Sequence, residues 1–404
     1  FTFIYKHRHR NMPLIFYRKI IPLFLCLLLL TVALFVAFFG SNSIYLGIDQ
    51  VEFSHKSWIF PADSSKSNVE AAASCKAYDE LRNINFLSDS IRDRICSGTA
   101  AYAIVNGSFP LCRLRDRLPD EIMDQVRSRS QLASLPSPVT GRSLPCYIYS
   151  ERDYISDEIR KRTGFETNNV AALIGLLRRI KSDRGVAPNG VTFVDVGSNI
   201  GVFSLAAMDL GVPVVSLDAN IRNLLRIRLS AEALMTRNRL NKSASDITTA
   251  IRSHLVWNFI SSRVSLSYLN FPVDCNVGGA TKFSRAVADT IPVMSSSGNA
   301  LARILDPGST LIMKIDIEGG EADFLKTSYQ LFDNFSIPVV QMEWLRRHMS
   351  RDEQVFMMNF FTSRGYVPTL GGSFASLSTA RLARFNGDIV WTKLSFFNQG
   401  HLFA

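Results

Sequence analysis

The chain has 404 residues, 47% of them hydrophobic and 20% charged, which is typical of a globular protein carrying one additional apolar segment. Its formal net charge is +10, but residues 1–19 hold five basic and no acidic side chains, and the remainder holds 40 basic and 35 acidic ones. This near balance, without a dense basic stripe, argues against a nucleic-acid partner.

Residues 20–39 form a run of twenty residues without a charge. A helix of this length spans a hydrocarbon core of roughly 30 Å, so the segment 20–40 is predicted to be a transmembrane signal anchor. A cleaved signal peptide is the alternative, but apolar signal-peptide cores span about 7–15 residues. The basic tail, 1–19, is expected on the cytoplasmic side, which makes the protein single-pass type II with its catalytic domain lumenal.

Residues 41–150 are interpreted as a stem and a small cysteine-containing neck. Four cysteines in this part of the sequence, Cys75, Cys96, Cys112 and Cys146, could form two disulfides in any of three pairings in an oxidising compartment. No C-x-x-C spacing occurs, which argues against a cysteine-ligated zinc site. The role of this region and the oligomeric state are left open.

From about residue 151 the pattern changes to short apolar strands alternating with helices. The expected strands are 191–196, 212–217, 254–260, 311–317, 339–344 and 388–394, and the expected helices are 169–180, 201–210, 222–235, 321–331 and 352–364. Strands that alternate with helices indicate βαβ units and a parallel sheet covered on both faces. Residues 151–404 are therefore predicted to form an α/β domain.

The densest motif is the run from Val194 to Gly201, where a strand ends and a helix begins. Gly197 permits a tight turn and a close backbone approach, while Gly201 opens a helix whose amides can receive a carboxylate. Asp195 places a negative charge beside the turn, which suits an ammonium group. A ligand bearing both groups is an amino acid, and S-adenosylmethionine presents one. The alternative interpretation is a plain tight turn with a surface Asp.

The same motif disfavours a dinucleotide. The G-x-G-x-x-G pattern would require glycines at 197, 199 and 202, but Asn199 and Val202 occupy two of these positions. Asp218 ends the next strand, 23 residues after Asp195. An acidic residue there can accept both ribose hydroxyls, a requirement that dinucleotides and adenosyl cofactors share.

A second motif, Lys314-Ile-Asp-Ile-Glu-Gly-Gly-Glu321, ends a later strand. Strand alternation would place Lys314, Asp316 and Glu318 on one side, facing the crevice predicted beside Gly197. The alternative is a Lys–Asp pair with Glu318 acting as a helix cap. Glu343 ends the neighbouring strand in the equivalent position, and the nearby His348 is interpreted as an exposed loop residue.

Together these pieces resemble the FkbM-type S-adenosylmethionine-dependent methyltransferases over roughly residues 150–395. The resemblance is carried by Gly164-Phe-Glu-Thr167, Phe193-Val-Asp-Val-Gly-Ser-Asn-Ile-Gly201, Asn276-Val-Gly-Gly279, Lys314-Ile-Asp-Ile-Glu-Gly319, Glu343 and Asp388-Ile-Val-Trp391. Two departures are present. Asp218 stands where the family usually has Glu-Pro, and residues 288–307 offer only Asp289 or Asp306 for the family's Leu-Asp element.

The resemblance implies a Rossmann-like seven-stranded sheet and O-methylation of hydroxyls on sugars or other natural products. Asp195, Gly197, Asn199, Gly201 and Asp218 are then expected to hold S-adenosylmethionine, with Asp316, Glu318, Glu343 and Lys314 on the acceptor side. The carboxylates could also hold a divalent metal, because oxygen ligands suit Mg²⁺ or Mn²⁺. With a lumenal domain, the expected acceptor is a glycan or small molecule in the Golgi. The alternative is an inactive methyltransferase-like binding module at a membrane.

Overall fold

The computed structural model describes residues 94–97, 111–183, 187, 190–239, 253–262, 266–270, 281–283, 290–382 and 384–397. All of them belong to one compact unit, Lys66–Ala404. The predicted tail, the apolar segment 20–40, the stem, Cys75, Asn276-Val-Gly-Gly279 and Asp289 lie outside the described residues. Within the described ranges, no helix combines the length and apolarity that crossing a membrane requires.

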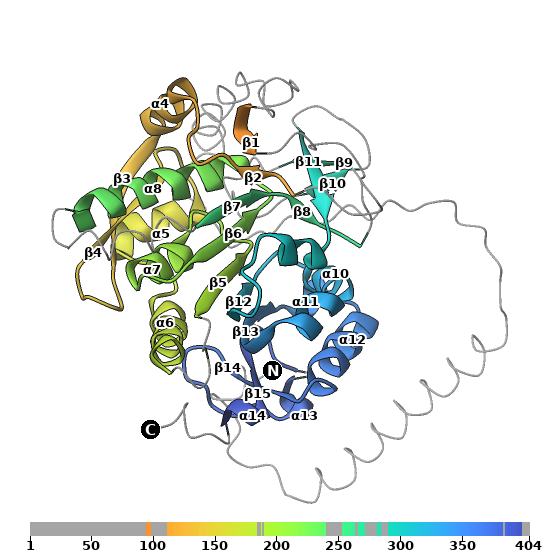
Figure 1. The fold of residues 1–404 in the computed structure, drawn as a ribbon. Helices are drawn as coiled ribbons and strands as arrows, with labels where there is room; N and C mark the ends of the chain where they lie inside the picture. Colours follow the sequence, from red (N-terminus) through yellow and green to blue (C-terminus); the bar gives the residue numbers. More distant parts are fainter. Residues whose placement is uncertain are drawn as a thin grey trace, which may run out of the picture. The chain divides into compact units, whose positions relative to one another are not determined.

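A nine-stranded sheet lies at the centre of the unit (Figure 1). Its order is β1(Cys96–Ser97), β2(Arg113–Leu114), β7(His254–Trp257), β6(Val214–Asp218), β5(Val191–Val196), β12(Thr310–Ile315), β13(Ser336–Trp344), β15(Gly387–Lys393) and β14(Tyr366–Leu370). The five strands from β7 to β13 are mutually parallel. β15 runs antiparallel to both of its neighbours, and β2 runs antiparallel to β7. The sheet is therefore mixed and mainly parallel, which confirms the predicted α/β class. It has nine strands rather than the seven expected, because β1 and β2 extend it beyond β7.

The strand order reverses between β5 and β12, because the chain first builds outward through β6 and β7 and then returns to the other side of β5. In open α/β sheets, ligands bind outside the carboxyl ends of the strands at such a reversal. Both sequence motifs lie at this point, since β5 leads into the glycine turn and β12 leads into the Asp316–Glu321 segment.

Helices pack on both faces of the sheet because its strands are apolar on both sides. Phe193 of β5 joins one core with α6(Thr167–Ser182), α7(Val202–Asp209) and α8(Ile221–Arg239). Val194 joins the other core, with α10(Glu321–Lys326), α11(Tyr329–Asn334) and α12(Arg351–Thr362). Figure 1 shows α10, α11 and α12 in blue, apart from the green and yellow helices. Because side chains alternate along a strand, those of Asp195 and Lys314 lie on the face of the sheet that α6 and α7 cover.

The described part of the predicted neck packs onto α8. It contains α4(Asp120–Ser128), followed by a hairpin of β3(Ser130–Pro136) and β4(Ser143–Tyr149), and then α5(Tyr154–Arg162) begins the next segment. The buried Arg226 guanidinium lies 3.4 Å from the centre of the Tyr149 ring, and the Tyr149 hydroxyl donates to Asn223 Oδ1 at 2.7 Å. Polar contacts thus join the hairpin to the helix that follows β6.

Of the two disulfides expected among the four cysteines, one joins Cys96 to Cys112, while Cys146, which the second would need, is free. The disulfide links β1 to the residue that precedes β2. Cys146 is a buried free cysteine on β4, and burial raises the pKa of its thiol to about 12.

Several predicted elements are divided in the structure. The helix expected at 321–331 is α10 and α11, separated at Thr327 and Ser328, whose hydroxyls donate back to the carbonyls of Asp323 and Phe324. Such side-chain bonds compete with a continuous helix. The strand expected at 254–260 is β7 and β8(Phe259–Ile260), divided at Asn258, whose side chain accepts from the Cys112 amide at 2.9 Å.

A smaller four-stranded sheet was not expected from the sequence. It has the order β10(Thr281–Phe283), β9(Leu266–Asn270), β11(Ile291–Ser296) and β8. A 3-10 helix, η3(Gly298–Arg303), leads from it toward β12, and a second, η4(Arg346–His348), follows β13. The short helices α13(Thr379–Leu382) and α14(Leu394–Phe397) flank β15.

Candidate active site

The glycine turn after β5 is required by the neighbouring strand as well as by its own bend. Gly197 has a φ of 81°, and a Cβ there would lie 1.7 Å from the backbone oxygen of Asp316. The amides of Gly197 and Ser198 both donate to the carbonyl of Leu217. Gly201 has a φ of 88°, and a Cβ there would lie 2.7 Å from Ile227 of α8. The glycines therefore bring β5, β12 and α8 into close contact.

Asp195 lies at the centre of this arrangement and is almost completely buried. Its Oδ2 accepts from the Ser204 hydroxyl at 2.6 Å, and Ser204 in turn contacts the Ser216 hydroxyl at 2.8 Å. Desolvation raises the pKa of Asp195 in spite of the nearby Lys314 charge. Its other oxygen, Oδ1, is buried without a hydrogen-bond partner among the described residues.

Asp218 and Asn199 are joined directly. The Asn199 amide donates to Asp218 Oδ2 at 2.7 Å, and the Asn220 amide donates to Oδ1 at the same distance. Desolvation raises the pKa of Asp218 to about 6, although both amide bonds favour its charged form. Asn199 adopts a left-handed φ of 48°, and its side-chain oxygen accepts from the next amide, that of Ile200. Asn199 thus orients the turn toward Asp218.

Two further polar atoms beside the turn are buried without a partner among the described residues: Ser198 Oγ and Asn220 Nδ2. Both residues are at most 5% exposed. Buried polar groups in folded proteins are nearly always hydrogen-bonded, so an unsatisfied group is a place to look for a missing ligand or water. With Asp195 Oδ1, these atoms form a set of one charged acceptor, one hydroxyl and one amide donor around the ends of β5 and β6.

A polar row crosses the sheet at the reversal point. In the strand register, Lys314 of β12 pairs with Asp195 on one side and with Gln341 of β13 on the other. Lys314 Nζ lies 2.9 Å from Asp316 Oδ2, and only 7% of the lysine side chain is exposed. Burial alone would lower the pKa of Lys314, but the charges of Asp316, Asp195 and Glu166 outweigh burial and raise it.

The Lys–Asp pair that the sequence offered as an alternative is therefore present, but the helix cap expected with it is not, because α10 begins after Gly320 without a side-chain cap bond. Glu321 Oε1 accepts from the amides of Ile317 and Gly319, at 2.9 and 3.4 Å. Strand geometry ends at Ile315, and Glu318 adopts a left-handed φ of 53°. The expected alternation through Glu318 is wrong for that reason, because the turn rather than the strand directs its side chain.

Carboxylates crowd this end of the sheet. Desolvation is the first cause of a raised pKa at each of four groups, and the nearby negative charge of Asp316 adds to it. The pKa values are about 7 for Glu318, about 7 for Glu321, about 9 for Glu343 and about 7 for Asp388. A group with a pKa near 7 can give or take a proton at neutral pH, which suits general acid–base chemistry.

Glu166, Asn169 and Asp388 belong to the site but were not named as site residues from the sequence. Asn169 Nδ2, in the first turn of α6, donates both to Glu166 Oε2 and to Asp388 Oδ2. Asp388 pairs in register with Glu343 across β13 and β15. A signal was available, because Glu166 and Asp388 both lie in segments that carry the family resemblance.

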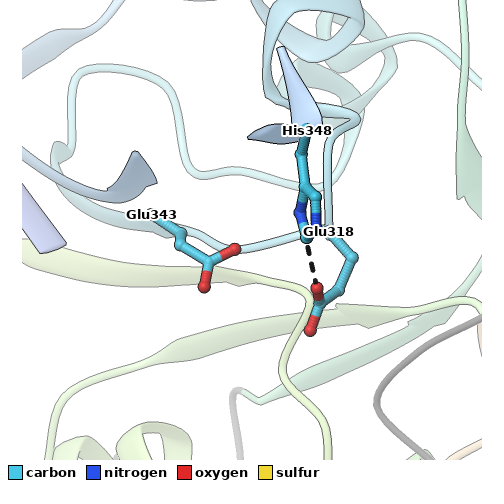
Figure 2. A group of neighbouring side chains, drawn as sticks. All are labelled: Glu318, Glu343 and His348. Carbon is cyan, nitrogen blue, oxygen red and sulfur yellow. Dashed lines mark ion pairs between the residues drawn. The ribbon is translucent and has the colours of Figure 1, made fainter. Parts of the chain in front are cut away.

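The segment after β13 brings His348 next to Glu318. His348 Nδ1 lies 3.9 Å from Glu318 Oε2, and Gly319 passes beneath it, so that a Cβ on Gly319 would lie 3.3 Å from His348 Cβ. Figure 2 shows the side chain of Glu343 extending toward this pair. His348 was interpreted as an exposed loop residue, but it is half-buried and contacts a predicted site residue.

The comparisons with known proteins concern the fold. No protein-family model matches the chain, and no curated protein matches it. The S-adenosylmethionine-dependent methyltransferase from Agrobacterium tumefaciens is similar over 65% of this chain and 69% of its own, at 9% identity and a TM-score of 0.32. The METTL16 methyltransferase domain is similar over 71% of this chain and 98% of its own, at 10% identity and a TM-score of 0.30.

The bifunctional kinase-methyltransferase WbdD is similar over 55% of this chain, at 11% identity and a TM-score of 0.30, and the match spans 38% of the length of WbdD. With TM-scores of 0.30 to 0.32, these similarities assign no activity to the chain, and the methyltransferase class stays a prediction. The narrower FkbM assignment stays a prediction from the sequence motifs.

Proposed function

We propose that the chain is an S-adenosylmethionine-dependent methyltransferase that methylates a hydroxyl group on a glycan or a related small acceptor of the secretory pathway. S-adenosylmethionine supplies an activated methyl group. The protein then has to bind the cofactor, align the acceptor oxygen and remove its proton.

The buried polar atoms without a partner, Asp195 Oδ1, Ser198 Oγ and Asn220 Nδ2, carry this proposal. Together with Asp218 they fit the polar groups of an adenosyl amino acid. A buried carboxylate oxygen suits an ammonium group, and a carboxylate at the end of the second strand suits ribose hydroxyls. Leaving these groups unpaired would be costly, so a ligand that pairs with them gains that free energy on binding.

The acceptor side follows from the second motif. Glu318 combines a pKa near 7 with a side chain that is 42% exposed, so it can reach an acceptor and take up a proton at neutral pH. Asp316 is paired with Lys314, so it is less able than Glu318 to move toward an acceptor. Burial and the neighbouring carboxylates raise the pKa of Glu343, so it takes up a proton more readily than an ordinary glutamate.

The secretory location is supported by two features. The apolar segment 20–40 with its basic tail predicts a type II signal anchor, and the Cys96–Cys112 disulfide is of a kind that persists in oxidising compartments such as the secretory lumen. A Golgi enzyme acting on glycans combines these features. Protease protection of the C-terminal region in sealed microsomes tests the orientation, and cleavage of that region in intact vesicles would contradict the glycan proposal.

Isothermal titration calorimetry with three ligands tests the cofactor. S-adenosylmethionine and S-adenosylhomocysteine are expected to bind in a one-to-one ratio, and NAD is expected not to bind. Binding of NAD alone would indicate a dinucleotide enzyme. Absence of binding by all three would favour an inactive methyltransferase-like module at a membrane.

A further inference from the structure

We propose that Glu318, Glu343 and His348 form a binding site for one divalent transition-metal ion of the Mn²⁺ or Zn²⁺ type, on the acceptor side of the proposed methyltransferase site. The proposal rests on the proposed function only for the role of the ion. Binding of the ion itself is a separate property of these three side chains.

The donor atoms are already close together. One oxygen from each glutamate and a ring nitrogen of His348 all lie within 4.8 Å of one another, and the Glu318 Oε2–His348 Nδ1 distance is 3.9 Å. Metal–ligand bonds of about 2.0–2.2 Å place two ligands of one ion about 3 to 4 Å apart. The half-exposed Glu318 can therefore close the site by a small rotation of its side chain (Figure 2).

The three ligands come from positions that the fold holds near each other. Glu343 is on β13, paired with Asp388 of β15, and Glu318 is in the turn after β12. His348 ends η4, and its backbone oxygen and Cβ lie against Gly319, next to Glu318 in the chain. The trio is thus positioned by two adjacent strands and by a contact between the segments that follow them.

A buried polar side chain without a described partner lies on the same strand as Glu343. Gln341 is 1% exposed, and its Nε2 has no hydrogen-bond partner among the described residues. Strand alternation places its side chain on the same face of β13 as Glu343. An oxygen atom bound to the ion, from water or from the methyl acceptor, would accept a hydrogen bond from this buried amide.

The donor set selects the kind of ion. Imidazole suits the later first-row metals, whereas Mg²⁺ and Ca²⁺ prefer oxygen donors alone. One contact has to change on binding. Arg347 Nε donates to His348 Nε2 at 3.4 Å, but an imidazole bound through Nδ1 carries its proton on Nε2. Arg347 itself is exposed.

The ion would leave coordination positions open, because the protein supplies three ligands. A hydroxyl bound at an open position loses its proton more readily, since the cation stabilises the alkoxide. In the proposed methyltransferase this would assist deprotonation of the acceptor hydroxyl.

The test is a titration of the purified full-length chain in detergent, stripped with a chelator, with Mn²⁺ followed by electron paramagnetic resonance. One Mn²⁺ per chain is expected at micromolar concentrations, with Zn²⁺ displacing it and Mg²⁺ doing so poorly. Glu343→Gln and His348→Ala are each expected to weaken Mn²⁺ binding at least about tenfold. Glu121→Gln, an exposed glutamate on α4, is the matched control and should bind as the unmodified chain does.

Circular dichroism and the midpoint of thermal unfolding show whether each variant folds, and Glu318→Gln supplies a second variant at a half-exposed position. Mn²⁺ binding that survives Glu343→Gln and His348→Ala, or no Mn²⁺ or Zn²⁺ binding by the unmodified chain, would overturn the proposal. S-adenosylmethionine binding is measured separately in excess chelator. Cofactor binding without metal binding refutes only the metal site, and metal binding without cofactor binding refutes only the proposed methyltransferase.

Discussion

Lys314 is the buried cation of the polar row, and its replacement by methionine is the sharpest test of the electrostatics of the site. Its side chain is 7% exposed, lies 2.9 Å from Asp316 and pairs in register with Asp195. Removing one partner of a buried ion pair costs about 3–5 kcal/mol, because the other charge remains buried and uncompensated. Asp316 is 27% exposed and can hydrate, so most of the loss is attributed to Asp195, which is 1% exposed.

The loss should depend on pH in a definite direction. The raised pKa of Lys314 keeps its own contribution constant at all pH values below its unfolded pKa of about 10.4. Burial already raises the pKa values of Asp195 and Glu166, and loss of the lysine charge raises them further. A carboxyl group with a raised folded pKa stabilises the protein at low pH, and this contribution disappears as pH rises through that pKa. The variant should therefore lose about 3–5 kcal/mol near pH 8 and less near pH 5.

Urea unfolding of the full-length chain near pH 5 and near pH 8 measures the loss of stability and its dependence on pH. Lys326→Met is the matched control. Lys326 also pairs with an aspartate, Asp323 at 3.4 Å, but it is 40% exposed. An exposed pair contributes roughly 0–1 kcal/mol, so this control should unfold nearly as the unmodified chain does. Equal losses for the two variants, or a loss for Lys314→Met that does not change with pH, would refute the assignment of Lys314 as the buried counter-charge.

Further predictions concern the turn and the division of roles. Asp195→Ala should abolish S-adenosylmethionine binding in calorimetry, while Asp316→Asn should bind the cofactor but lose turnover, and normal affinity in the first variant would refute this division. Gly197→Ala should destabilise the fold by about 3 kcal/mol more than Gly190→Ala, because both glycines have positive φ but only the Cβ at 197 meets a backbone oxygen; similar unfolding midpoints would show that the clash is relieved. Turnover should rise with pH through about 7 as Glu318 loses its proton, and Glu318→Gln should remove that rise. A pH profile that persists in Glu318→Gln would assign the base to another group.

Local patterns in the sequence were sufficient to predict most of the central strands and the helices beside them. The strand predicted at 191–196 agrees with β5 at both ends, because its apolar run is closed by the glycine turn. The edge strand β14 was not predicted. It contains Pro368, and proline argues against a strand except at the edge of a sheet, where its missing amide is tolerated. Its position at the edge is known only once the order of the strands is known.

The site residues likewise divide into those that the sequence predicted and those that only the tertiary structure brings together. Asp195 and Asp218 lie at the ends of their strands and Gly197 directly follows the first, so the sequence alone predicted that they meet at one edge of a parallel sheet. Glu166 and Asp388 are far apart in the chain, and they come together only because β15 lies next to β13 and the start of α6 contacts Asp388 through Asn169. No local sequence pattern predicts a contact between residues so far apart in the chain.

The sequence by itself determined the alternation of strands and helices, the glycine turn and the acids at the strand ends, because each depends on the conformations open to a few neighbouring residues. The tertiary structure alone decided which charges became buried and paired. It placed Lys314 among Asp195, Asp316 and Glu166, bonded Glu321 to the amides of Ile317 and Gly319, and brought His348 to Glu318. These outcomes depend on packing between distant segments, since burial and pairing are properties of the assembled sheet rather than of any one strand.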